Sequence, residues 1–278
     1  MSSPKLGTAE LLFRSAEELG LQPVWVMPGG ILAIQVAGKE RYLNLARSPL
    51  NSHLSISLSV DKYLTRLVFA RHKLANIPFA RATTHAEANL FLESHGTIIA
   101  KPVTGSGSRD IHIITTYQQL HALTVTNYIL EKYIVGPEMR YLILDGSVIG
   151  AYQSDYGISV QSNRTLQCLA LPPESWDPTL VSMAGQATAA LGLGFAAVDF
   201  IISGSDSYIL EVNTTPDLKW FHAPSFGPVV DVARLFLESI VQHYTDQTPN
   251  FVQAEFSHRH SPVVSLPAIV PASNFIPL

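Results

Sequence analysis

The stretch AAVDFIISGSDSYILEVN, residues 196–213, carries the most information about the fold. Two apolar runs flank a Gly/Ser/Asp segment, which predicts an antiparallel β-hairpin. If the loop is Gly204-Ser205-Asp206, counting outward from Ser205 places Asp199 opposite Glu211. Strand alternation then assigns to the core face Val198, Phe200, Ile202, Tyr208, Leu210 and Val212.

Two carboxylates directly opposite each other on one face should repel, so Asp199 and Glu211 require a compensating cation. Asn213 follows Glu211 by two residues and therefore shares its face. Two anionic oxygens and an amide oxygen are ligands for a hard cation, which predicts a site for Mg²⁺ or Mn²⁺ together with phosphate oxygens and water. A slipped register or a solvated polar face is the alternative interpretation.

The rest of the chain alternates helical and strand patterns. Helices are expected over residues 8–19, 117–123, 179–191 and 228–244, and a helix capped by Asp61 is expected to bury Leu64, Leu67, Val68 and Leu74. Strands are expected over residues 22–27, 31–36, 41–46, 97–101, 111–115 and 128–133, followed by a hairpin turned by Asp145-Gly146. Two hairpins among interleaved elements predict an α+β fold with mixed sheets.

Composition excludes several classes of protein. The chain has 278 residues, 14% of them charged, a net charge of -4 and one cysteine, Cys168. An acidic balance argues against nucleic acid or an anionic membrane as the partner, and a lone cysteine argues against disulfides and cysteine-based zinc sites. With no secretory signal or apolar run long enough to span a membrane, we expect a cytoplasmic protein.

Cations and a glycine loop suggest a phosphate site. Lys101 lies in the apolar run IIAKPV and needs an anionic partner if it is buried. The loop GSGSRD, which contains Gly105, Ser106 and Gly107, could present N–H groups to phosphate, although an ordinary turn is the simpler reading. Lys62 follows the Asp61 cap and could be a second phosphate ligand or a solvated helix lysine.

In EKYIVGPEMRY, residues 131–141, a strand runs into the break at Gly136-Pro137. Glu131 and Glu138 flank that break, and backbone groups around residues 133–135 could contact an adenine edge. Arg140 shares a face with Glu138 and is expected opposite Ala151, which would leave space for a carboxylate or acyl-phosphate. The alternative for Arg140 is a surface ion pair with Glu138.

These segments together resemble the ATP-grasp carboxylate-amine ligases over residues 59–243. The carrying motifs are DKYLTR at residue 61, IIAKP at 98, the GSG loop, EKYI at 131, a strand arginine, VDF at 198 and EVN at 211. The sequence is most similar to the ligase part of cyanophycin synthetase and of bifunctional glutathione synthetases. The segment QSNR at residue 161 is similar to ribosomal-protein glutamate ligases.

The resemblance implies an ATP-grasp fold and a role for each motif. It implies phosphate contacts from Lys62, Lys101 and the loop of Gly105, Ser106 and Gly107; adenine and ribose contacts from Glu131, Lys132, Tyr133, Ile134 and Glu138; metal ligands Asp199, Glu211 and Asn213; and substrate contacts from Arg140, Asn163, Arg164 and His222. Lys101 and Arg140 would be the catalytic residues. The sequence departs from the family at Ser108, Asp110 and Asp217, where relatives have glycine.

The implied organisation has four parts. Residues 1–58 form a short α/β cap, residues 59–133 and 134–250 form two α+β subdomains that clamp ATP, and residues 251–278 form a Pro-rich apolar tail. The implied activity is ADP-forming amide synthesis on an amino acid or peptide, with a homodimer expected from the low surface charge. A nucleotide-binding protein without turnover and a small-molecule kinase remain the alternatives.

Overall fold

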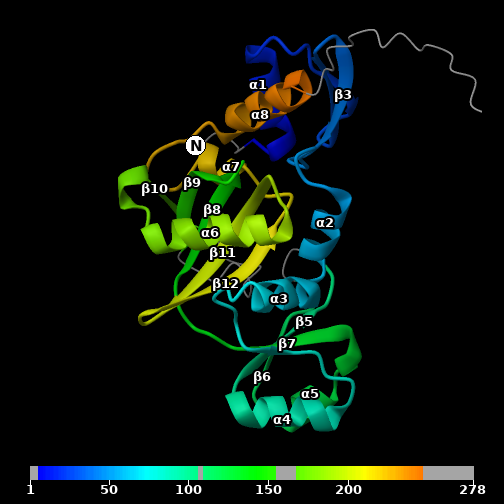
Figure 1. Cartoon of the computed structure of the whole chain (residues 1–278), viewed down its shortest axis with the longest axis vertical. Coiled ribbons are helices and arrows are strands. Elements are labelled where there is room, and N and C mark those ends of the chain that lie inside the picture. Colours follow the sequence, from blue (N-terminus) through cyan, green and yellow to red (C-terminus); the bar gives the residue numbers. More distant parts are fainter. Residues whose placement is uncertain (1–5, 106–108, 155–166, 247–278) are drawn as a thin grey trace, which may run out of the picture. The chain divides into compact units, whose positions relative to one another are not determined.

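The strands of the chain form three sheets (Figure 1). The structure, a computed structural model, describes residues 6–105, 109–154 and 167–246. The predicted α+β class is confirmed. The expectation of mixed sheets is wrong, because every strand pair within the three sheets is antiparallel among the described residues.

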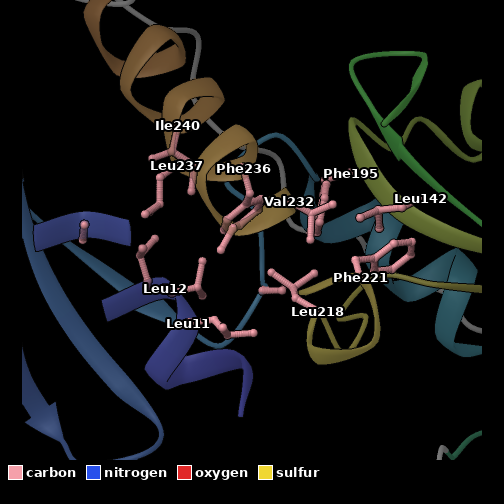
Figure 2. Packing of buried hydrophobic residues seen from close by; sticks show 14 of the residues in the cluster. Leu11, Leu12, Leu142, Phe195, Leu218, Phe221, Val232, Phe236, Leu237 and Ile240 are labelled. Carbon is pink, nitrogen blue, oxygen red and sulfur yellow. The ribbon is translucent and has the colours of Figure 1, made fainter. Parts of the chain in front are cut away.

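The N-terminal region is a helix on a small sheet. It contains α1 (Thr8–Glu18), β1 (Val24–Met27), β2 (Ile31–Val36) and β3 (Lys39–Asn44), in the sheet order β1-β2-β3. Leu11 and Leu12 of α1 pack against Leu237 and Ile240 of the C-terminal helix α8 (Val232–Asp246) in one buried cluster, shown in Figure 2. Residues on both sides of the predicted boundary at residue 58 therefore contribute to this one core.

The middle region contains a four-stranded sheet in the order β4-β7-β5-β6. Its elements are α4 (His85–His95), α5 (Tyr117–His121), the 3₁₀ turn Val125–Asn127, β4 (Phe79–Ala80), β5 (Ile98–Pro102), β6 (His112–Ile114) and β7 (Tyr128–Lys132). Ile98, Ala100 and Leu130 pack with Leu92 and Leu120 of the helices in one apolar cluster. This sheet carries Lys101 on β5 and Glu131 on β7.

The largest sheet has the order β10-β9-β8-β11-β12. Its strands are β8 (Glu138–Leu144), β9 (Ser147–Ser154), β10 (Cys168–Leu171), β11 (Phe195–Ser203) and β12 (Asp206–Asn213). Helix α6 (Pro178–Leu191) lies across one face (Figure 1), while α7 (Lys219–His222) and the 3₁₀ turn Pro173–Ser175 complete the region. Most of strand β11 is buried, and Asp199 is its one charged residue.

Two helices differ from the sequence analysis. Helix α2 (His53–Val60) was not predicted, because its alternating serines give no helical period; Ser52 caps it by accepting from Ser55 N at 3.1 Å. Helix α3 (Lys62–Arg71) has the predicted Asp61 cap. Of the four residues predicted to be buried, Val68 and Leu74 pack against an apolar cluster, whereas Leu64 and Leu67 are exposed. Arg66, a charged residue, is only 2% exposed.

No helix in the described ranges is long and apolar enough to cross a lipid bilayer. The tail at residues 251–278 lies outside the described residues.

Gly136 lies where the chain passes from β7 to β8, and we expect Gly136→Ala to destabilise the protein. A Cβ atom at this position would lie 1.7 Å from the Ile202 carbonyl oxygen, a backbone atom held in β11. Overpacking of this kind costs about 1–3 kcal/mol. Urea denaturation followed by circular dichroism measures the loss of unfolding free energy.

Gly185→Ala is the matched control, because a Cβ there would meet its nearest atom, the Gly146 carbonyl oxygen, at an ordinary 3.6 Å. Gly185 lies inside α6, where alanine favours the helix by about 0.8–1.0 kcal/mol. Equal stability of the two variants would contradict the close approach at Gly136.

Candidate active site

The β11/β12 hairpin places Asp199 directly opposite Glu211, as predicted. The turn, however, contains only Gly204 and Ser205, because Ser203 pairs with Asp206. A β-bulge next to Asp199 compensates for the shorter turn. The bulge also changes the faces: Ile209 packs on the α6 side with Val198, whereas the predicted Leu210 and Tyr208 pack in a separate cluster.

Arg140 on β8 pairs with Asp199 in the interior. Its Nε and Nη2 atoms donate to the two carboxylate oxygens at 2.5 and 2.6 Å, and Asp199 is fully buried. Burial alone would lower the pKa of Arg140, but the Asp199 carboxylate outweighs it and raises that pKa above its ordinary value. The surface ion pair with Glu138 is therefore not the observed arrangement.

The neighbour of Arg140 on β9 also differs from the prediction. A bulge near Ile143 shifts the register by one residue, so Arg140 faces Tyr152 and not Ala151. Tyr152 is buried, and its ring centroid lies 5.9 Å from the guanidinium carbon. Glu138, also buried, faces Ser154 on β9 and Ile201 on β11.

Lys101, Glu131 and Arg66 form a buried charge cluster. Arg66 Nε donates to Glu131 Oε1 at 2.7 Å, and Lys101 Nζ lies 2.8 Å from Oε2. Burial would raise the pKa of Glu131, but the two cations lower it to about 2. Each carboxylate oxygen of Glu131 therefore has one cation beside it, Arg66 at Oε1 and Lys101 at Oε2.

A pocket of about 680 Å³, including space open to solvent, joins these groups. Among its lining residues are Lys62, Arg66, Lys101, Gly105, Glu131, Glu211 and Asn213. Lys62 Nζ donates to the Gly105 carbonyl at 2.9 Å, and burial lowers the pKa of Lys62 while the Glu211 carboxylate opposes that effect. Lys62 is therefore a pocket residue and not an isolated surface lysine.

The oxygen set at the end of the hairpin suits a hard divalent cation. Burial raises the pKa of Glu211 and the Asp199 carboxylate raises it further, while Arg140, Lys101 and Lys62 oppose the rise. No cluster of three or more His, Cys, Asp or Glu residues suited to a metal occurs in the described parts of the chain. Two carboxylates and the Asn213 amide, whose oxygen accepts from Thr215 N at 2.9 Å, are nevertheless sufficient where phosphate and water complete the shell.

Fewer backbone N–H groups near the end of β7 are available to contact an adenine than the sequence suggests. The N–H of Lys132 donates to Pro78 O and that of Tyr133 to Thr97 O. The sequence could not reveal these bonds, because the acceptors lie in distant segments. The Ile134 side chain packs with Ile77, Ile201, Leu210 and Tyr208 in an apolar cluster, and Leu210 also lines the pocket.

His222 lies outside the lining of this pocket, and its imidazole contacts α8. Its Nε2 accepts from Ala233 N at 3.1 Å, and Asp231 Oδ1 lies 3.6 Å away. Burial lowers the pKa of His222, with Asp231 opposing. Ser106, Gly107, Asn163 and Arg164 fall outside the described residues.

Acidification should therefore destabilise the fold through His222. Protonation of Nε2 removes the acceptor for Ala233 N, and a native pKa below the unfolded value of 6.5 means that the unfolded chain binds the proton more tightly. Stability is fully present above pH 6.5 and decreases as the pH falls below it. Denaturation at pH 7.5 and about 5.5 should show a larger loss in the parent than in His222→Asn, and equal losses would contradict this role.

Arg66 is the pocket residue that sequence reasoning missed. A charged residue in an amphipathic helix is normally assigned to the solvent face. Its spacing of four residues from Lys62 places both on one helical face, and that spacing was the available signal.

The matches to known proteins agree with this geometry. Residues 59–217, more than half of the chain, match the model of the ATP-grasp domain family. A probable alpha-L-glutamate ligase of Parasynechococcus marenigrum is 26% identical over 210 residues, covering 69% of this chain and 43% of its own. A D-alanine–D-alanine ligase of Desulforudis audaxviator is 27% identical over 218 residues, covering 68% and 69%. The chain thus spans less than half of the length of the glutamate ligase.

Solved structures show the same fold. A bifunctional glutathione synthetase from Pasteurella multocida aligns with a TM-score of 0.62 at 12% identity, covering 85% of this chain and 43% of its own. The ATP-grasp ligase PsnB in complex with a minimal precursor aligns with a TM-score of 0.57 at 15% identity, covering 69% and 64%.

Proposed function

Because the chain belongs to the ATP-grasp family, we propose that it is an ADP-forming ligase that joins a carboxylate to an amine through an acyl-phosphate. The observation that carries the proposal is one pocket in which Lys62, Lys101 and Glu131 meet Glu211 and Asn213. Cations suit a triphosphate, and the oxygen ligands suit the divalent ion that accompanies it in phosphoryl transfer. Named relatives of the chain are themselves ligases.

The nucleotide would occupy this pocket with its phosphates at the cations. Lys62 and Lys101 carry positive charge at the pocket wall, and the adjacent Gly105 begins the loop that includes Ser106 and Gly107. Glu131 Oε2 is buried at the pocket beside Lys101, and a carboxylate oxygen has a second lone pair that can accept from an adenine amino group. The backbone of residues 132–134 and the apolar cluster around Ile134 would contact the base, and Glu138 the ribose.

In the reaction, a carboxylate oxygen forms a bond to the γ-phosphorus while the bond to ADP breaks. The amine then attacks the acyl carbon, phosphate leaves, and the amine loses a proton to give the amide. A Mg²⁺ or Mn²⁺ ion held by Asp199, Glu211 and Asn213 would supply charge neutralisation at the phosphates. Lys101 and Arg140 stabilise the moving negative charge, and neither residue acts as a nucleophile.

Arg140 is proposed to contact the acyl-phosphate. Its Nε and Nη2 atoms are engaged by Asp199, and the third nitrogen, Nη1, would be the donor toward the reacting carboxylate. Asn163, Arg164 and His222 remain proposed substrate residues on the resemblance alone. The substrate class that we propose is an amino acid or peptide, as the names of the relatives suggest.

The chief reason to consider a protein without turnover is Asp110, an acid next to a phosphate loop. Its carboxylate, however, accepts from Tyr128 Oη at 2.6 Å and contacts His112 Nε2 at 2.7 Å. The bond to Asp110 raises the pKa of Tyr128 to about 12. Both oxygens of Asp110 thus contact side chains that are not among the residues lining the pocket.

The test is ADP release by the full chain with Mg²⁺ and ATP against a panel of amino acids, dipeptides and amine acceptors. Glutamate and D-alanine are tested first, because the names of the relatives contain these amino acids. ADP and an amide product together support the proposal. A phosphorylated small molecule would identify a kinase, and ATP binding with no turnover on any pair would favour a nucleotide-binding protein.

We also propose a cytoplasmic location, supported by the presence of a single cysteine, Cys168, which is buried. A homodimer is proposed from the low proportion of charged residues, 14%.

A further inference from the structure

The bulge in β12 determines whether the two carboxylates of the hairpin can meet. From the turn, Ser203 pairs with Asp206, Ile201 with Tyr208 and Phe200 with Ile209. Regular continuation of this ladder would pair Asp199 with Leu210 and Val198 with Glu211. The bulge leaves Leu210 as the extra residue, and Asp199 faces Glu211 instead.

Without the bulge, the Glu211 carboxylate would lie on the wrong face of the sheet. Paired residues share a face, and Val198 lies in the apolar cluster covered by α6. A one-residue shift would therefore move Glu211 from the pocket into that cluster. The pairing of Asp199 with Glu211 thus depends on whatever holds the bulge.

Arg66 of α3 holds the carbonyl groups of the bulge. Strand β12 is an edge strand, and Figure 1 shows α3 beside it. Arg66 Nη1 donates to Ile209 O at 2.6 Å and Nη2 to Leu210 O at 2.7 Å. Both residues are buried, and a carbonyl left without a partner away from water is unfavourable.

The same guanidinium reaches the nucleotide side of the pocket. Nε donates to Glu131 Oε1 at 2.7 Å, and Nη1 also donates to Asn76 Oδ1 at 3.1 Å. One rigid, planar group therefore serves four acceptors on three segments of the chain. Lysine offers a point charge and cannot reproduce this pattern.

We propose that Arg66 is a positioning residue for the metal site: by bonding the carbonyls of Ile209 and Leu210 it fixes the bulge that sets Glu211 opposite Asp199. The inference rests on the proposed function, since it assigns the residue to the divalent-ion site of that reaction. Arg66 acts through Glu211 and need not touch the ion.

The test measures Mn²⁺ binding to the full chain by electron paramagnetic resonance of free Mn²⁺, with saturating ADP. Loss of a group that orients a metal ligand typically weakens metal affinity by about 10–100-fold. We expect a loss in this range for Arg66→Lys. Arg71→Lys, an exposed position in the last turn of the same helix, should leave Mn²⁺ affinity unchanged.

A second pair of variants, on a Glu131→Gln background, keeps the test informative if Arg66→Lys does not fold. Glu131→Gln is compared with the double variant Arg66→Met/Glu131→Gln, which removes the charges of both Arg66 and Glu131 and leaves that of Lys101 in place. The double variant should bind Mn²⁺ about 10-fold more weakly than Glu131→Gln, because it also lacks the bonds to the Ile209 and Leu210 carbonyls.

Three outcomes would overturn the inference. The first is parent-like Mn²⁺ affinity in folded Arg66→Lys, or equal affinities in the two variants that carry Glu131→Gln. The second is an equal loss of ADP affinity measured in EDTA, which would mean that Arg66 serves the nucleotide pocket in general. Neither of these two outcomes contradicts the proposed function of the parent. The third outcome is a parent that binds neither ADP nor Mn²⁺, and it would contradict the proposed function as well.

Discussion

Substrate-dependent ADP release should fall by about 10²–10³-fold or more when Lys101 is replaced by methionine, the range observed when one preorganised donor to a developing charge is removed. Lys101 is 4% exposed, and its Nζ lies at the wall of the pocket beside Glu131. Methionine preserves much of the stem but removes the charge. Solvent cannot easily replace that charge at a buried position, so the loss should appear in kcat.

The fold should survive this change, because Glu131 keeps its bond to Arg66. Circular dichroism verifies the fold, and a coupled assay measures ADP. Lys39→Met, at an exposed position on β3, is the control and should retain parent activity. Parent-like turnover in folded Lys101→Met would remove Lys101 from the mechanism.

Among the single variants proposed here, Arg140→Met should lower the free energy of unfolding the most. Asp199 is fully buried and bonded bidentately to Arg140, so the variant leaves a buried carboxylate without its partner. Breaking a buried ion pair in this way costs about 3–5 kcal/mol. Chemical denaturation of the parent and the variant measures the difference in unfolding free energy.

The double variant Arg140→Met/Asp199→Asn separates charge from packing. It should recover most of the stability, because residue 199 no longer carries a buried charge without a partner, and it should be inactive because both groups are missing. A double variant as unstable as Arg140→Met alone would show that the charge pair is not the cause. An unchanged stability in Arg140→Met would contradict the pairing itself.

Local patterns predicted much of the fold because they depend on neighbours in sequence. The Asp61 cap and the N-terminal strands follow from short-range chemistry and agree with the structure. Helix α2 was missed because its serines bond to distant backbone: Ser55 Oγ donates to Gly192 O and Ser59 Oγ to Val212 O. Those acceptors belong to tertiary structure and leave no periodic signal in residues 53–60.

The candidate site also has features that depend on tertiary structure and that local sequence patterns do not predict. The pairing of Asp199 with Glu211 could be predicted, although the predicted loop was one residue too long and the bulge compensated for it. What holds the bulge, a buried arginine more than a hundred residues upstream, could not be inferred from strand alternation. The partner of Arg140 likewise depended on a bulge in β8/β9.

The central claim is that a carboxylate is activated as an acyl-phosphate, and oxygen tracing tests it most directly. A substrate carboxylate labelled with ¹⁸O is incubated with ATP, the amine and the full chain, and the released phosphate is analysed by mass spectrometry. The account predicts one ¹⁸O atom per phosphate, because the oxygen that attacks the γ-phosphorus leaves with it. Unlabelled phosphate, or label found in AMP, would contradict an acyl-phosphate intermediate.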